Sequence, residues 1–338
     1  MSELTHGTVD TNGITIHYVE QGEGPLVVFC HGFPESWYSW RHQLPAVAEA
    51  GFRAVALSMR GYGKTSAPAA IDSYSIMHLI GDVVGVVNHL GAEQSTPGRE
   101  DRRAVVVGHD WGAPVAWYSA LTRPDMFRAV AGLSVPFLPA VGGLPDGVTV
   151  NDLMRMNAGP ERDYYRLYFQ EPGVAEADLE SDLRHSVLGF LYAISGDAFA
   201  NGHQEPGWDG HFPMGQTMSQ QMIVPETLPP WLTEADVQFY IDELAESGFR
   251  GGLNWYRNIN RLPGDLAPWV GATIEQPSFY MGGSTDMIAG NTEENLTAMQ
   301  AALPDLRHCE IVDGAGHWLQ QERPAEVNKA LLEFLAGL

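Results

Sequence analysis

The sequence predicts an α/β fold in which a doubly wound, mostly parallel sheet is interrupted by an inserted helical cap. Short apolar runs alternate with helical patterns in both halves of the 338-residue chain, and this alternation is typical of parallel sheets covered by helices. After Val135 and Pro136 the alternation stops for roughly 125 residues, and a gap of that size indicates a domain rather than a loop. We therefore expect a core at residues 1–136 and 263–338, with the cap at residues 137–262.

The negative charge of the chain argues against nucleic acid and anionic membranes as binding partners. The formal net charge is −23, and the lysines are Lys64 and Lys329 alone. Such a surface repels nucleic acid and anionic membranes. No apolar run approaches the length of a membrane span, and the first residues lack the basic and apolar regions of a signal peptide. We expect a cytoplasmic monomer or homodimer that binds neither nucleic acid nor membrane.

The cysteines and histidines predict neither a disulfide nor a metal site. Cys30 and Cys309 fall in expected strands near opposite ends of the chain, so we expect two buried free thiols. His203, Asp209 and His211 form a loose group in a Gly/Pro-rich loop. Solvated loop residues are the better interpretation of that group, because its spacing matches no metal motif.

The first part of the core is expected to hold five strand regions. Residues 9–20 predict two strands that turn at Asn12-Gly13, a strong hairpin signal. Further strands are expected at residues 26–30, 52–57, 105–107 and 127–133, and helices at residues 40–50 and 74–90. The polar stretch 94–103 predicts a surface loop that tolerates insertions.

The cap and the last part of the core follow. Cap helices are expected at residues 161–169, 175–195, 234–247 and 253–260, with an irregular region at 196–230. Thr233 and Asp236 resemble a capping box at the start of the third helix. Strands are then expected at residues 278–281 and 308–312, and helices at residues 291–303 and 325–335.

The stretch VVVGHDWGA, residues 105–113, has the layout of a nucleophile elbow. A short strand ends at Gly108, a helix follows Gly112, and Asp110 stands between them. In a G-x-nucleophile-x-G turn the middle residue is lifted clear of the sheet, and the small residues let strand and helix approach closely. A serine there would attack acyl groups. A carboxylate can instead displace a leaving group at a saturated carbon and form an ester on the enzyme.

Two further residues complete a catalytic set. Asp286 and His317 each follow an expected strand, so they meet Asp110 at the carboxyl edge of the sheet. The order nucleophile, acid, histidine is that of α/β-hydrolase folds. Asp265 and Asp313 are the nearest alternatives to Asp286 as the acid.

The turn HGFP, residues 31–34, is expected to complete an oxyanion pocket. Hydrolysis of an ester at Asp110 passes through a tetrahedral intermediate whose oxygen needs N–H donors. The backbone N–H groups of Phe33 and Trp111 are the expected donors, and Pro34 would rigidify the turn. His31 is expected to be structural.

These motifs together make the sequence resemble the epoxide hydrolases of the α/β-hydrolase fold. The matching segments are HGFPESWYSWRHQ (31–43), RGYG (60–63), GHDWGAPVAW (108–117), YRLYFQEPG (165–173), SGFRGGLNWYRN (247–258) and GHW (316–318). The resemblance implies a small-molecule epoxide as substrate, no cofactor, and two cap tyrosines that hydrogen-bond the epoxide oxygen, at Tyr165 and Tyr256. It also exposes a departure at Ser58, where family members usually carry an acidic residue.

The sequence leaves two alternatives to epoxide hydrolysis open. A haloalkane dehalogenase shares the fold and the aspartate followed by tryptophan, but it needs donors for a halide rather than two acidic hydroxyls. A non-catalytic ligand-binding member of the fold would not need Asp110, Asp286 and His317 together. Side chains expected to shape the pocket are Met154, Phe190, Leu191, Met218 and Met222.

Overall fold

One eight-stranded sheet forms the centre of the protein. The computed structural model describes residues 3–93, 103–140, 142–203 and 209–338. The strand order in the sheet is β1-β2-β4-β3-β5-β6-β9-β10. Its strands are β1 (Thr5–Thr11), β2 (Ile14–Gln21), β3 (Leu26–Cys30), β4 (Arg53–Leu57), β5 (Ala104–His109), β6 (Phe127–Leu133), β9 (Ser278–Gly283) and β10 (Leu306–Val312). The predicted doubly wound, mostly parallel sheet is confirmed.

The first strands of the sheet form the antiparallel part. β1 pairs with β2 and β2 pairs with β4 in antiparallel register, whereas β4, β3, β5, β6, β9 and β10 are mutually parallel. Asn12 and Gly13 both have positive φ, at 48° and 77°, as a two-residue turn between twisted strands requires. The hairpin predicted at residues 9–20 therefore exists, and its strands extend from residue 5 to residue 21.

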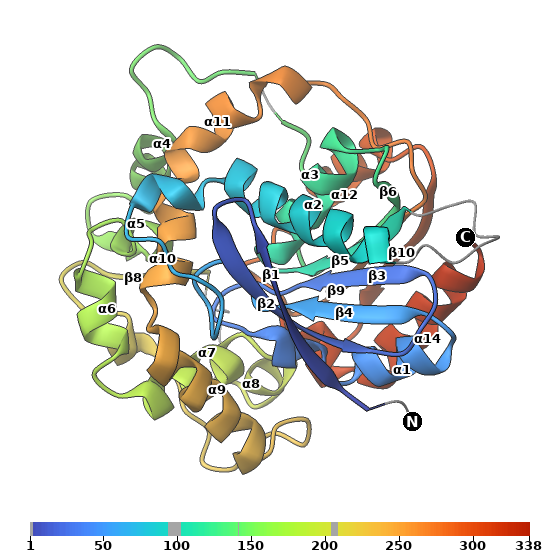
Figure 1. Ribbon diagram of the computed structural model, residues 1–338. Coiled ribbons are helices and arrows are strands. Elements are labelled where there is room, and N and C mark those ends of the chain that lie inside the picture. Colours follow the sequence, from blue (N-terminus) through green and yellow to red (C-terminus); the bar gives the residue numbers. More distant parts are fainter. Residues whose placement is uncertain (1–2, 94–102, 141, 204–208) are drawn as a thin grey trace.

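Helices cover both faces of the sheet. Alternate residues of β3 enter different clusters, with Val28 and Cys30 in one and Val27 and Phe29 in the other. This alternation explains why β3 is apolar throughout. The helices of the first face are α2 (Ile76–Glu93), α3 (Gly112–Thr122) and α12 (Glu293–Ala302), and those of the second are α1 (Gln43–Glu49), α13 (Leu319–Glu322) and α14 (Pro324–Ala336) (Figure 1).

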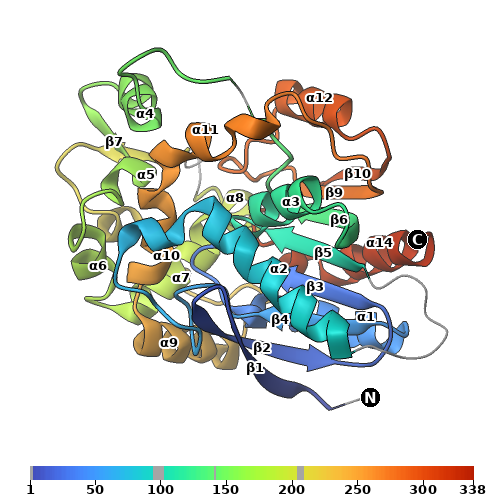
Figure 2. The ribbon, with the colours of Figure 1, turned by 45° about the horizontal axis from the view of Figure 1, so that its top comes forward.

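The segment between β6 and β9 is mainly helical and gathers at one end of the sheet (Figure 2). Its α-helices are α4 (Val150–Ala158), α5 (Tyr165–Tyr168), α6 (Val174–Leu179), α7 (Leu183–Ala193), α8 (Gly196–Ala200), α9 (Glu234–Ser247), α10 (Arg250–Arg257) and α11 (Leu262–Asp265). A small antiparallel pair joins β7 (Arg162–Tyr164) to β8 (His211–Pro213). Short 3₁₀ turns complete the fold at η1 (Trp37–Trp40), η2 (Ile71–Tyr74), η3 (Ser219–Gln221), η4 (Ile259–Arg261) and η5 (Ala267–Trp269).

Helices of the inserted segment differ from the predicted ones in several places, and N-cap side chains explain some of these differences. The helix expected at 175–195 is two helices, because Asp182 accepts a hydrogen bond from the His185 N–H and starts α7 there. The helix expected at 161–169 is largely replaced by β7 and the single turn of α5. α4 was not expected from its weak apolar pattern, although Thr149 starts it with a capping box. The box predicted at Thr233 is present at the start of α9.

Several other expectations concern the surface. Cys30 is buried as predicted, but Cys309 is exposed, because β10 is the edge strand of the sheet and its outer residues are largely uncovered. Apart from Arg103, the loop predicted at 94–103 lies outside the described residues. Within the described ranges, no helix is long and apolar enough to cross a membrane. The same part of the chain holds no group of three His, Cys, Asp or Glu side chains placed to bind a metal.

Candidate active site

The turn after β5 holds Asp110 in a strained backbone conformation. Its φ is 50°, a region that non-glycine residues seldom adopt. A Cβ on Gly108 would lie 2.0 Å from the Gly112 carbonyl oxygen, and a Cβ on Gly112 would lie 2.1 Å from the Cys30 carbonyl oxygen. Both distances are below contact, so the close approach of β5, β3 and α3 requires glycine at both positions. The result is a carboxylate raised above the carboxyl edge of the sheet.

Asp110 lies between the HGFP turn and His317. Its Oδ1 accepts a hydrogen bond of 2.7 Å from the Phe33 N–H, and its Oδ2 lies 3.4 Å from His317 Nε2. A Cβ on Gly32 would lie 2.2 Å from Asp110 Oδ1, so glycine is needed there as well. The Trp111 backbone N–H begins α3, where the first N–H groups have no partner within the helix. Of the two expected oxyanion donors, the Phe33 N–H thus contacts the carboxylate, and the Trp111 N–H follows Asp110 directly in the chain.

The acid predicted for His317 is the one in contact with it. Asp286 Oδ2 lies 2.8 Å from His317 Nδ1, and Asp286 Oδ1 accepts from the Ile288 and Ala289 N–H groups. The two alternatives lie elsewhere. Asp265 faces Arg261 at 3.8 Å, and Asp313 is an exposed residue that accepts from the Ser284 hydroxyl.

The charges of these groups are strongly coupled. Burial alone would raise the pKa of Asp110, but the hydrogen bond and charge of His317 hold it below its usual value. Burial would lower the pKa of His317, but the charge of Asp286 and the contact with Asp110 raise it well above its usual value. Both shifts act in the direction of an ionised Asp110 and a protonated His317.

A buried network of polar side chains lies behind His317, and the sequence analysis did not predict it. The His317 carbonyl accepts from His109 Nε2 at 2.7 Å and from the Ser134 hydroxyl at 2.6 Å. His109 Nδ1 in turn contacts Glu35 Oε1 at 2.6 Å, and the same oxygen accepts from the Gly32 N–H. The signal in the sequence was the presence of the polar residues Glu35 and His109 in motifs beside apolar strands. These hydrogen bonds connect the turn that carries Asp110, the HGFP turn and the loop that carries His317.

Glu322 is a second buried carboxylate that was missed. It accepts hydrogen bonds from the backbone N–H groups of Gly316, Trp318 and Gly196 at 2.9 to 3.0 Å. Burial raises the pKa of Glu322, although these donors favour its ionised form. Because Gly196 belongs to the cap, this side chain fixes the His317 loop against the cap.

A cavity of about 410 Å³ opens above Asp110 and His317. Tyr165 and Tyr256 both line it, with ring centroids 5.9 Å apart, so the two predicted tyrosines meet at the nucleophile. Burial raises the pKa of each hydroxyl, and both tyrosines are therefore neutral donors. Tyr164 also lines the cavity, whereas the Tyr168 hydroxyl donates to Asp178 outside it.

The side chains predicted to shape the pocket do not form the apolar walls of this cavity, although Phe190, Met218 and Met222 line a separate small cavity in the cap. None of Met154, Phe190, Leu191, Met218 and Met222 is among the lining residues of the cavity above Asp110. The apolar lining comes instead from Ile76, Trp111, Pro114, Tyr118, Val135, Pro136, Leu138, Ile259, Leu262, Leu266, Ile288 and Ala289. Many of these belong to the core or to the segments where the cap leaves and rejoins it, and the sequence pattern gave no orientation for such segments.

Two residues near the site have structural contacts. His31 Nδ1 donates to the Gly32 carbonyl and Nε2 accepts from the Met59 N–H, and burial lowers the pKa of His31 to about 4. The unusual Ser58 is buried, and its hydroxyl lies 2.9 Å from His17 Nδ1. The departure at Ser58 thus changes a local contact between β2 and the RGYG turn.

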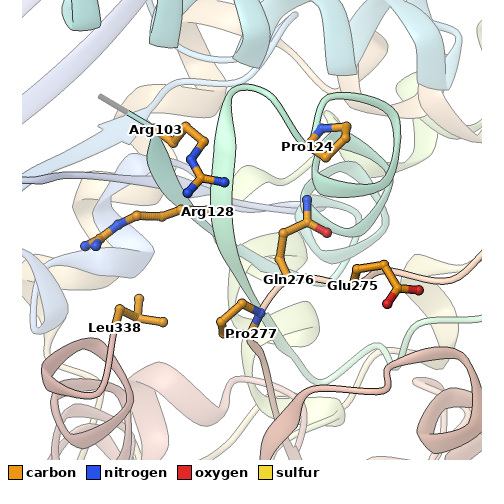
Figure 3. A pocket seen from close by; sticks show the side chains of 7 residues that line it. All are labelled: Arg103, Pro124, Arg128, Glu275, Gln276, Pro277 and Leu338. Atoms are coloured by element: carbon orange, nitrogen blue, oxygen red, sulfur yellow. The ribbon is translucent and has the colours of Figure 1, made fainter. Parts of the chain in front are cut away.

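A second cavity, of about 430 Å³, lies at the amino ends of β5, β6 and β9 (Figure 3). Its lining includes Arg103, Arg128 and Gln276, which precede or begin those strands. Because the carboxyl ends of the strands carry Asp110, Asp286 and His317, this cavity is at the opposite edge of the sheet.

The arrangement around Asp110 suits attack on a saturated carbon that carries an oxygen leaving group. It combines an ionised carboxylate, two neutral phenols across the same cavity, and a histidine that is oriented by a second carboxylate.

Comparison with known proteins places the chain in a family. Residues 25–324 match the family model described as alpha/beta hydrolase fold. The chain is 42% identical to epoxide hydrolase A of Mycobacterium tuberculosis, over 100% of this chain and 99% of that protein. It is 40% identical to bifunctional epoxide hydrolase 2 of Sus scrofa, over 99% of this chain and 56% of that protein.

Solved structures agree with the sequence relatives. An epoxide hydrolase from an endophytic Streptomyces superposes with a TM-score of 0.90 and 45% identity, covering 99% of this chain and 96% of that one. Epoxide hydrolase A from Mycobacterium thermoresistibile superposes with a TM-score of 0.86 and 40% identity, covering 99% of each chain. The chain therefore belongs to the epoxide hydrolases of the alpha/beta hydrolase fold.

Proposed function

We propose that the protein hydrolyses small-molecule epoxides to vicinal diols through an ester formed on Asp110. The observation that carries this proposal is the placement of Tyr165 and Tyr256 in the cavity directly above Asp110. An epoxide is strained but has a poor leaving group. It needs a nucleophile on one side and an acid on the other, and this cavity supplies both.

The first step opens the ring. Asp110 attacks one epoxide carbon from behind, the carbon–oxygen bond breaks, and the phenols of Tyr165 and Tyr256 stabilise and protonate the departing oxygen. The product of this step is a hydroxyalkyl ester on Asp110. The apolar walls of the cavity exclude water from the ring-opening step and favour apolar substituents on the epoxide.

The second step hydrolyses the ester. His317 takes a proton from water, and that water attacks the ester carbonyl while the N–H groups of Phe33 and Trp111 hold the oxyanion. Esterification removes the charge of Asp110, which is one of the causes that raise the pKa of His317. The pKa of His317 therefore falls once the ester forms, the ring releases its proton to solvent, and the neutral imidazole then serves as the base.

The alternative reaction is haloalkane dehalogenation on the same aspartate. The hydroxyls of Tyr165 and Tyr256 favour the epoxide, because they supply protons to an oxygen that must leave as an alcohol. A halide needs no proton. Assays that separately measure diol release from styrene oxide and halide release from a haloalkane distinguish the two reactions.

The ester itself is tested with a His317→Gln variant. This variant should still be alkylated but should hydrolyse the ester very slowly, because ring opening needs no base. Intact-mass measurement after addition of styrene oxide should show an increase equal to the mass of the epoxide, which maps to the peptide containing Asp110. The control is an Asp110→Asn/His317→Gln double variant, which should acquire no such mass. Equal labelling of both proteins would remove Asp110 from the reaction.

A further inference from the structure

Arg166 places a positive charge at one of the two tyrosines. It follows Tyr165 in α5, and its guanidinium turns back so that Nε donates a 2.8 Å hydrogen bond to the Tyr165 hydroxyl oxygen. Its Cζ lies 5.4 Å from the centroid of the Tyr165 ring, and the side chain lines the same cavity as Asp110.

Arg166 differs from other arginines of the protein in its lack of a carboxylate partner among the described residues. Three other arginines with little exposed surface pair with acids: Arg60 with Asp82 at 2.6 Å, Arg257 with Glu176 at 2.8 Å, and Arg41 with Asp236 at 3.1 Å. Over the ranges that the structure describes, no salt bridge is formed by Arg166. A cation that lines a cavity without an acidic partner is costly for the fold, and this cost indicates a role for the charge in the cavity.

The direction of the hydrogen bond determines what it can do. A guanidinium can only donate, so the contact uses a lone pair of the Tyr165 oxygen and leaves the phenolic proton for another acceptor. Burial raises the pKa of Tyr165, but the charge and hydrogen bond of Arg166 oppose that effect. Burial and the charge of Asp110 raise the pKa of Tyr256 well above its usual value, and the charge of Arg166 opposes them from a distance, without a hydrogen bond. Among the described side chains, none donates a hydrogen bond to the Tyr256 hydroxyl, so the two phenols differ in this contact.

We propose that Arg166 is a positioning residue that makes Tyr165 the proton donor to the departing epoxide oxygen, while Tyr256 only holds that oxygen by a hydrogen bond. This inference rests on the proposed ring opening at Asp110. As the Asp110–carbon bond forms and the carbon–oxygen bond breaks, the electron pair on the oxygen takes the Tyr165 proton. The phenolate that remains is paired with the guanidinium. After ester hydrolysis the carboxylic acid at Asp110 loses a proton, and one proton returns to Tyr165.

The test measures the two steps separately in single turnovers of styrene oxide with excess enzyme. Arg166→Gln should slow epoxide consumption about tenfold, the size expected for loss of a hydrogen bond from a charged donor, and should leave ester hydrolysis unchanged. Arg166→Lys, which keeps the cation, should recover most of the lost rate. In a Tyr165→Phe background, Arg166→Gln should change epoxide consumption by less than about twofold, because the hydroxyl on which it acts is gone.

Controls separate this inference from the reaction on which it rests. Arg155→Gln removes a cap arginine that pairs with Asp163 outside the cavity, and it should leave both steps unchanged. If the wild-type protein consumes no epoxide, the proposed function is wrong. If Arg166→Gln slows epoxide consumption equally in both backgrounds, or only weakens binding of a fatty-acid epoxide, Arg166 does not act through Tyr165.

Discussion

His317 lies between two carboxylates that contact different nitrogens of its ring. Asp286 holds Nδ1 at 2.8 Å, and Asp110 lies 3.4 Å from Nε2. In the proposed reaction the same histidine pairs with Asp110 before ring opening and faces the ester after it. In that reaction Asp286 would take no chemical part in either step, and its contact with Nδ1 would fix the ring and support its positive charge.

Asp286→Asn tests that role through the pH dependence of ester hydrolysis. His317 acts as a base only when neutral, so the hydrolysis rate rises with pH as the imidazolium loses its proton. Burial lowers the pKa of His317 and the charge of Asp286 raises it, so removing that charge lowers the pKa. The acid limb of the profile should move to lower pH, and the plateau should fall at least about a hundredfold. A fully active Asp286→Asn protein beside an inactive Asp265→Asn protein would identify a different acid.

The nucleophile elbow shows how an element imposes residue types. Gly108 and Gly112 are required because β5, α3 and β3 approach within contact distance there. Gly108→Ala should lower the free energy of unfolding by at least about 2 kcal/mol, because the new Cβ must displace the backbone of α3. Activity should fall with it, since Asp110 would move.

A glycine in α2 is the matched control for this substitution. Gly91 has no atom within 4 Å of the position that a Cβ would occupy. Gly91→Ala should raise the free energy of unfolding by up to about 1 kcal/mol, because alanine favours the helix. Chemical denaturation of both variants measures the difference. Equal stability of the two proteins would show that the elbow is not tightly packed.

The elements of the core were predictable from the sequence, whereas those of the cap were only partly so. Buried parallel strands such as β3 and β5 are continuous apolar runs bounded by glycine, and this signal is local. In the cap, helix limits depend on single side-chain caps such as Asp182, and β7 depends on a partner strand 49 residues along the chain, as in the pair Asp163 and Phe212. Pairing between segments so far apart cannot be predicted from a short stretch of sequence.

The same division holds for the site. Asp110, His317 and Asp286 follow strands that end at one edge of the sheet, so topology alone predicted that they would meet. The contacts of Glu35 and Glu322 were not predictable, because they join distant loops through backbone N–H groups. The orientation of Arg166 toward Tyr165 depends on the single turn of α5, which the sequence predicted as a longer helix.

On the scale of the whole molecule, one buried ion pair joins three parts of the chain. Asp82 of α2 contacts Arg60 of the RGYG turn at 2.6 Å and accepts from the Asn12 side chain at the hairpin turn. Asp82→Asn should lower the free energy of unfolding by about 3 kcal/mol, because it leaves the Arg60 charge buried without a counterion.

An exposed pair provides the control for Asp82. Arg123 and Asp125 lie 2.7 Å apart, with 40% and 63% of their side chains exposed. Asp125→Asn should change the free energy of unfolding by less than about 1 kcal/mol, since water screens this pair. Thermal or chemical unfolding measures both. A similar small effect for both variants would mean that the Arg60–Asp82 pair does not hold the hairpin to α2.

The central claim is that the bond to the substrate carbon is made by Asp110 and not by water. The measurement is a single turnover of styrene oxide by excess enzyme in heavy-oxygen water, followed by mass spectrometry of the diol. Because ester hydrolysis breaks the bond at the carbonyl carbon, the first diol should carry an unlabelled oxygen from Asp110, and the label should enter the carboxylate. A first-turnover diol that is fully labelled, with no label in the peptide containing Asp110, would show that water attacks the epoxide directly and would contradict the account.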